Sequence, residues 1–176
     1  MIKKSVAALL PVLLLLLCVG CGEQGTHAED RAAVTAVVGQ LFTAPDKELE
    51  EAMDASMTVA GAGVPSGQAG AGTADALLEK RYGASFTGDA LSTFATTYAL
   101  SYPIDATRQG YTLKAGKVTV EAAGDSYTFA VSVSYGAQGG EQGKADITGS
   151  AQCTAEHKIS YFRIQDDGGL SEKLKA

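Results

Sequence analysis

Few side chains in this chain of 176 residues could act as a nucleophile, a base or a metal ligand. His27 and His157 are its only histidines, and neither has a second ligand at the spacing of a metal site. Cys153 would need an activating base beside it to serve as a catalytic nucleophile. Because Cys153 falls on an inward strand position, we interpret it as a small core residue and not as a partner of His157. The sequence therefore predicts neither a metal centre nor a catalytic residue.

Cys21 is the other cysteine with potential chemistry, and it ends a stretch with the properties of an export signal. Two lysines near the start precede an apolar run over residues 6–17, and small residues follow. The run is shorter than the ~20 apolar residues of a membrane-spanning helix, and Pro11 interrupts it. We therefore expect residues 1–20 to be a cleaved signal peptide. An ordinary secretory signal before a free cysteine, or an uncleaved anchor, is the alternative.

Val19-Gly20-Cys21 resembles the end of a bacterial lipoprotein signal, in which a small residue precedes a cysteine that is lipidated and becomes the new first residue. The resemblance implies fatty-acyl chains, such as palmitate, on Cys21. Stable anchoring takes more than one chain, which a diacyl or triacyl cysteine supplies. The mature protein would then be lipid-anchored in the cell membrane on its extracytoplasmic face, with residues 21–28 as a short polar tether and residues 29–176 as a single domain.

Charge and cysteine content narrow the classes of partner. The whole chain has 14 basic and 20 acidic residues, and removal of the signal with its two lysines leaves a net charge of −8. Such a domain is a poor candidate for binding nucleic acid or anionic lipid headgroups, and its scattered acidic residues indicate a solvated surface. Cys153 is the one thiol that cleavage and lipidation leave free, so we expect no intramolecular disulfide.

Two glycine-rich stretches have features of cofactor-binding loops. Residues 61–67 lack the spacing and the preceding strand of a dinucleotide-binding loop. Residues 70–73 open a predicted helix whose free N–H groups could hold an anion, but no lysine follows in the position of a phosphate-binding loop. We therefore interpret residues 60–72 as a flexible loop and Thr73 as a helix N-cap, and we expect no cofactor.

Helical spacing of apolar residues predicts four helices in the first part of the chain. In the first of them, Glu29 and Asp30 would lie in the opening turn, where the helix dipole favours negative charge. Thr43 and Asp46 have the spacing of a capping box before the second. Pro103 is expected to end the fourth. The predicted helices cover about residues 29–42, a short segment ending near residue 53, residues 73–82 and residues 88–101.

From Tyr111 onward the period changes from helical to two, which indicates β-strands. The strictest alternation runs over residues 127–135 and predicts a strand with one dry and one wet face. It continues over residues 145–153, whose small inward residues leave room for bulky neighbours such as helix side chains, and a further strand is predicted over residues 157–165. Gly116 interrupts the alternation, which predicts a bulge or tight turn. Helices followed by strands predict an α+β fold, with N-terminal helices packed on a curved antiparallel sheet.

This order of elements, over about residues 29–170, resembles the nuclear transport factor 2-like (cystatin-like) superfamily. The resemblance implies a cone-like fold in which helices fill the concave side of a bent sheet. It also implies an alternative activity, a small-molecule isomerase or dehydratase that uses a buried Asp or His in the cone. Here the inward strand positions are apolar, and the nearest carboxylates, Asp89 and Asp105, have the character of helix-end residues. The residues therefore favour a non-enzymatic role.

Tyrosines are the remaining candidates for ligand contacts. Their rings could line the cone while their hydroxyl groups face a small ligand, or they could be ordinary core and rim aromatics. The five candidates are Tyr82, Tyr98, Tyr127, Tyr135 and Tyr161. We expect a binding module for a small ligand, an envelope protein or a cell-wall component, with a purely structural or accessory lipoprotein as a further alternative.

Overall fold

The computed structural model describes residues 22–61, 73–137, 140 and 142–175. The predicted signal peptide, Cys21 and most of the predicted loop over residues 60–72 lie outside the described residues. Within the described part, no helix combines the length and the apolar character needed to cross a membrane.

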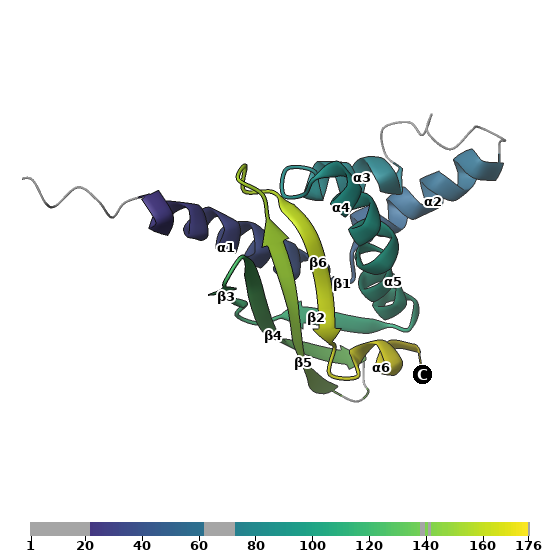
Figure 1. Cartoon of the computed structure of the whole chain (residues 1–176). Helices are drawn as coiled ribbons and strands as arrows, with labels where there is room; N and C mark the ends of the chain where they lie inside the picture. Colours follow the sequence, from purple (N-terminus) through teal and green to yellow (C-terminus); the bar gives the residue numbers. More distant parts are fainter. Residues whose placement is uncertain (1–21, 62–72, 138–139, 141, 176) are drawn as a thin grey trace, which may run out of the picture.

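The structure has the predicted α+β architecture, with helices followed by an antiparallel sheet. The helices are α1 (Gly22–Leu41), α2 (Lys47–Gly61), α3 (Ala74–Tyr82), α4 (Gly88–Phe94), the π-helical turn η1 (Ala95–Ala99), α5 (Ser101–Arg108) and α6 (Leu170–Lys175). The strands are β1 (Thr43–Ala44), β2 (Tyr111–Ala115), β3 (Thr119–Ala123), β4 (Ser126–Ala137), β5 (Gln142–Cys153) and β6 (Ile159–Asp166). Figure 1 shows the strands curling into a half-barrel, with α1 on one side and α3, α4 and α5 on the other.

The sheet is antiparallel throughout, in the order β1-β2-β4-β5-β6, and β3 pairs with β4 beyond the end of β2. Ala115 pairs with Val133 of β4, and Thr119 pairs with Ala130 of β4. The chain advances four residues between these pairs on one side and three on the other, and this extra residue makes a β-bulge. Within it the backbone N–H of Gly116 donates to the Ser132 carbonyl oxygen at 2.9 Å. The predicted interruption at Gly116 is thus confirmed.

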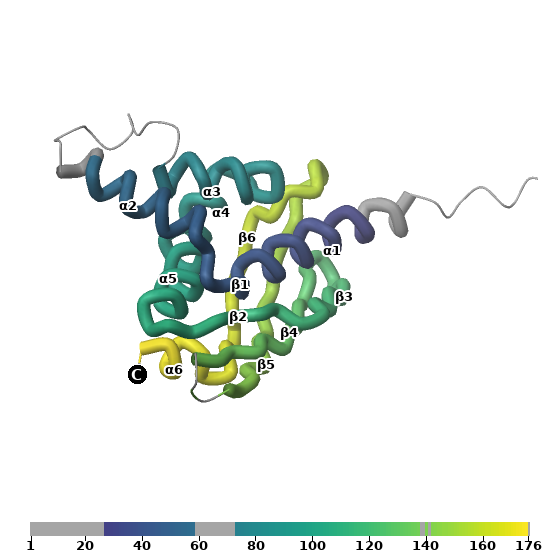
Figure 2. The backbone as a smooth tube through the Cα atoms, turned by 180° about the vertical axis from the view of Figure 1, so that it is seen from behind, coloured from purple at the N-terminus to yellow at the C-terminus, as the bar shows by residue number. Residues whose placement is uncertain are grey.

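Apolar side chains fill the space between the helices and the sheet. The predicted stripe of α1 is fully buried, at Val34, Val37, Val38, Leu41 and the following Phe42. Four stacked or edge-packed rings form the centre of the core, from Phe86, Phe94, Phe129 and Phe162. Figure 2 shows α1 from behind, crossing the strands that it covers. The half-barrel is therefore packed with rings from both layers.

Two predicted helix starts are wrong. α1 begins at Gly22, so the described residues of the expected tether are helical. The capping box of α2 does not form, because Thr43 lies in β1 and donates to the Gly39 carbonyl oxygen. Asp46 itself caps α2, with its Oδ1 accepting the N–H of Leu49 at 3.0 Å. α2 then continues to Gly61, well beyond the predicted end.

Two further predictions about helix ends need correction. Pro103 does not end the fourth helix, because it lies in the first turn of α5, where a missing N–H breaks no intrahelical bond. Thr73 occupies the N-cap position of α3 but makes no capping hydrogen bond, and its buried Oγ1 has no partner. A turn through Gly168 and Gly169 leads into the short helix α6, whose first turn is capped by Asp167.

Candidate functional site

The structure separates the five tyrosines proposed as ligand contacts. Tyr82 and Tyr98 both pack against Phe94 inside the aromatic core. Tyr127 is buried at the start of β4, where its ring meets the edge of His27. Tyr82 and Tyr98 thus share Phe94 as a packing partner, whereas Tyr127 contacts His27.

The other two tyrosines lie nearer the surface. Tyr135 is half-buried towards the end of β4 and packs against Tyr111. Tyr161 is 44% exposed. The two carboxylates named as catalytic alternatives also lie away from the core centre, since Asp89 is exposed in the first turn of α4 and Asp105 is half-buried on α5.

A polar cluster centred on Asp30 joins α1 to the sheet. Asp30 is 7% exposed, and its Oδ2 accepts the hydroxyl hydrogen of Tyr127 at 2.5 Å. Its Oδ1 lies 3.0 Å from Nδ1 of His157, which follows β5. Nε2 of His157 lies 3.2 Å from Oε2 of Glu29, and Nδ1 of His27 lies 2.7 Å from the Tyr127 hydroxyl oxygen. The sequence thus folds so that both histidines meet on one buried carboxylate and its tyrosine partner.

His157 is held in this position by an unusual backbone. Its φ is +60°, in the left-handed region, and no other non-glycine residue among those described has a positive φ. The tight turn between β5 and β6 imposes this conformation, with the His157 N–H donating to the Thr154 carbonyl oxygen at 3.0 Å. Strained non-glycine residues persist where surrounding contacts fix them. Here those contacts are the two carboxylates of α1.

The cluster keeps its hydroxyl and thiol protonated. Burial, followed by the hydrogen bond and the negative charge of Asp30, raises the pKa of Tyr127 well above its ordinary value. Burial and then the charge and hydrogen bond of Asp30 raise the pKa of Cys153 to about 12. Both groups are therefore donors to Asp30 at neutral pH. Cys153 is half-buried and packs against the core, and the structure also brings it and His157 to the same carboxylate.

Asp30 is the residue that the sequence analysis missed. It was assigned to an opening turn, where an exposed carboxylate is ordinary. Since α1 begins eight residues earlier, Asp30 lies inside the helix and on its buried stripe, four residues before Val34 and seven before Val37. The available signal was a carboxylate at the same helical spacing as the apolar residues of the stripe. This spacing places the carboxylate on the buried face, and a buried charge requires partners.

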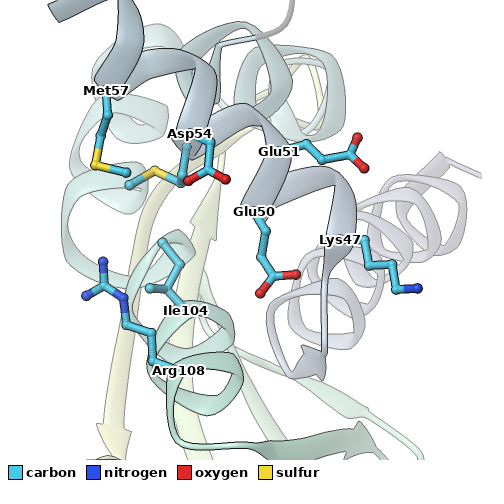
Figure 3. A pocket seen from close by; sticks show the side chains of 8 residues that line it. Lys47, Glu50, Glu51, Asp54, Met57, Ile104 and Arg108 are labelled. Atoms are coloured by element: carbon cyan, nitrogen blue, oxygen red, sulfur yellow. The ribbon is translucent and has the colours of Figure 1, made fainter. Parts of the chain in front are cut away.

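A second feature is a groove between α2 and α5, with a volume of about 440 Å³. Its apolar residues are Met53, Met57 and Ile104, and Met57 is 61% exposed. Charged side chains surround them, from Lys47, Glu50, Glu51, Asp54 and Arg108. In Figure 3, Ile104 and Arg108 extend from α5 towards α2, and Glu50 points into the space between the helices. We call this feature the α2–α5 groove.

An ion pair fixes the start of α2 against the end of α3. Arg81 contacts both oxygens of Asp46, through Nη1 to Oδ2 and through Nη2 to Oδ1 at 2.9 Å. Its Nη2 also donates to Oε2 of Glu48 at 2.8 Å. The side chains of Arg81 and Asp46 are 15% and 11% exposed. A small satellite core of Leu49, Ala52 and Leu77 packs against Met53 and Ile104, so this face of α2 is held while Met57 stays exposed.

No protein-family model, curated protein or solved structure matches the chain. The resemblances to a lipoprotein signal and to the nuclear transport factor 2-like superfamily therefore remain predictions. Among the described residues, no three histidine, cysteine or carboxylate side chains are placed to hold a metal ion together.

Proposed function

We propose that the protein is a lipid-anchored, extracytoplasmic binding module whose α2–α5 groove receives a basic, amphipathic segment of another envelope protein. The observation that carries this proposal is the exposure of Met57 at the mouth of a groove with an apolar floor. Large exposed apolar side chains beside a polar rim are typical of interaction sites. Membrane attachment through Cys21 rests on the lipoprotein resemblance of the first 21 residues.

The chemistry of the groove favours this class of partner. Methionine side chains adapt to apolar surfaces of varied shape, so Met53 and Met57 suit a partner that presents an apolar helix face. Three carboxylates stand against two basic groups at the rim, which leaves an excess of negative charge. Lysine or arginine on the partner would complement that excess.

The position of the groove supports a partner outside the bilayer. The first turn of α1 directly follows Cys21, the residue expected to carry the acyl chains. In Figure 1 this end of α1 and the far end of α2 lie on opposite sides of the molecule. A domain held at the membrane by the start of α1 would therefore direct α2 away from the membrane.

The enzymatic alternative has one observation in its favour, the contact between buried Asp30 and His157. A general base needs a free lone pair facing its substrate. Both oxygens of Asp30 already face donors, and Nε2 of His157 faces Glu29. The rings packed in the half-barrel also occupy the space that the resemblance assigns to a substrate. We therefore rank an isomerase or dehydratase second.

Anchoring is tested by metabolic labelling with an alkyne analogue of palmitate, followed by membrane fractionation. We expect the full-length chain to be labelled and to sediment with membranes. The Cys21→Ala variant should lose the label and leave the membrane fraction or stay unprocessed. An unlabelled wild-type protein in the culture medium would refute the anchor.

Docking is tested by photocrosslinking in intact cells, with p-benzoylphenylalanine in place of Met57. We expect a discrete protein adduct that disappears when Glu50→Lys and Asp54→Lys reverse the charge of the rim. The same crosslinker in place of Thr128, an exposed residue on the wet face of β4, is the matched control. Adducts that are equal at both positions, or that survive charge reversal, would contradict a charged docking groove.

A further inference from the structure

We propose that His157 and Asp30 form a pH-sensitive latch that fastens the N-terminal part of α1 to the sheet and loosens as the imidazole loses its proton. The latch consists of Asp30 and Glu29 on α1, Tyr127 on β4 and His157 in the turn between β5 and β6. It is a separate device from the α2–α5 groove, which none of these residues lines.

The N-terminal part of α1 depends on this cluster for its attachment. Among residues 27–33, Asp30 is the only buried one, and its neighbours are exposed or half-buried. Apolar burial starts at Val34 and continues to Leu41. The C-terminal half of α1 is thus held by the hydrophobic core, whereas residues 27–33 are held by the hydrogen bonds of one carboxylate and by the contacts of His27 and Glu29.

The contacts of His157 depend on its protonation state. A carboxylate only accepts hydrogen bonds, so the ring satisfies both Asp30 and Glu29 only when both of its nitrogens carry hydrogen. A neutral ring that keeps Nδ1–H for buried Asp30 turns the lone pair of Nε2 towards the Glu29 carboxylate, which repels it. The remaining bond to Asp30 also changes from a charge-assisted bond to a weaker neutral one.

Other titratable and charged groups also face this histidine, and they define its surroundings. Glu156 in the same turn adds a carboxylate beside the ring, and Arg31 on α1 adds a cation near Tyr127. Tyr127 and Cys153 remain neutral donors to Asp30. These groups include His27, Glu29, Asp30 and Arg31 on α1, Tyr127 on β4, Cys153 on β5, and Glu156 and Lys158 on either side of His157.

The consequence concerns the distance between the domain and its point of attachment, and this step rests on the proposed anchoring at Cys21. Residues 22–30 rise by ~1.5 Å each in a helix and by up to ~3.5 Å each when extended. Release of these residues would therefore about double their reach. A protonated latch holds the domain close to the bilayer, and a neutral one lets it stand further away.

Hydrogen exchange of the full-length protein in detergent micelles tests the latch. After correction for intrinsic exchange, we expect the protection of residues 22–30 to fall about fivefold from pH 5.5 to pH 8, the ratio that separates a charge-assisted from a neutral hydrogen bond. Residues 34–41 provide an internal control and should not change. Equal protection of residues 22–30 at both pH values would overturn the proposal.

Variants assign the effect to one histidine. Asparagine tolerates left-handed backbone, so His157→Asn should keep the turn and abolish the pH dependence. His27→Gln should retain the pH dependence, and loss of the pH dependence in that variant would overturn the assignment to His157. Glu29→Gln, at an exposed position, should reduce the dependence without unfolding the chain. Cys21→Ala should leave the dependence intact, so a failed latch and a failed anchor give different results.

Discussion

The ring of Phe129 on β4 lies over Gly149, the residue directly opposite it on β5. A Cβ atom at position 149 would come within 2.2 Å of Phe129 Cζ and 2.3 Å of the Arg163 carbonyl oxygen. Because both strands are fixed by their hydrogen bonds, the chain cannot easily relieve this overlap. We expect Gly149→Ala to lower the free energy of unfolding by about 3 kcal/mol, as overpacking does. Urea denaturation followed by circular dichroism measures it.

A second glycine gives the opposite prediction. Gly39 lies within α1, and an added Cβ there meets nothing within 4 Å. Alanine should therefore stabilise the helix by about 0.5–1 kcal/mol through reduced backbone entropy. The same denaturation experiment applies, and a loss of stability in both variants would show that crowding against Phe129 is not the cause at Gly149.

Removal of the Tyr127 hydroxyl tests the energy of the Asp30 cluster. Tyr127→Phe leaves the packing of the ring but deprives a buried carboxylate of one donor. We expect it to lower the free energy of unfolding by about 2 kcal/mol. Tyr161→Phe removes a hydroxyl from an exposed side chain and should change stability by less than about 0.5 kcal/mol. Similar values for the two variants would mean that the 2.5 Å contact contributes nothing.

The strands were predicted well because their pattern is local. The alternation over residues 127–135 and 145–153 depends only on one face of each strand being buried. The inward residues that it predicts, such as Val131, Val133 and Ile147, are buried in the structure. Gly149 on β5 leaves room for a bulky neighbour, as predicted, but that neighbour is a ring from the adjacent strand and not the helix side chain given as the example. That choice depends on strand register, which alternation alone does not give.

The sites were less accessible to sequence reasoning. The α2–α5 groove joins residues of two helices whose ends were both predicted wrongly. For α5 the cause is that a π-helical turn and the first-turn position of Pro103 let the chain continue as a helix. The Asp30 cluster joins residues about one hundred positions apart. A buried carboxylate on an apolar stripe signals that partners exist, but their identity depends on the fold.

Acid should weaken the attachment of α2 to α3. Partial burial raises the pKa of Asp46, but the hydrogen bonds from Arg81 and the Leu49 N–H, with the charge of Arg81, lower it more, and the net pKa lies below its usual value. The unfolded chain therefore binds a proton more readily, so this stabilisation is complete above about pH 5 and is lost as pH falls below about 4. Asp46→Asn should unfold more easily at pH 7, by about 2 kcal/mol, and should show a shallower acid transition.

The matched control for the acid transition is Asp89→Asn, which removes an exposed carboxylate from the first turn of α4. Its denaturation midpoint should depend on pH as that of the wild type does. Midpoints measured in urea at several pH values between 2.5 and 7 provide the comparison. If Asp46→Asn kept the full acid dependence, the Arg81 pair would not be the group that titrates.

Cys153 should resist alkylation in the folded protein. Burial and Asp30 raise the pKa of its thiol to about 12, and only the thiolate reacts. At pH 8 we expect iodoacetamide to modify Cys153 at least about a hundredfold more slowly in buffer than in urea, as quantified by peptide mass mapping. Asp30→Asn removes the negative charge beside the thiol and should speed the reaction in the folded state, with folding checked by circular dichroism. Asp89→Asn should leave the rate unchanged, and rapid modification of the native wild type would contradict the hydrogen-bonded position of Cys153 beside Asp30.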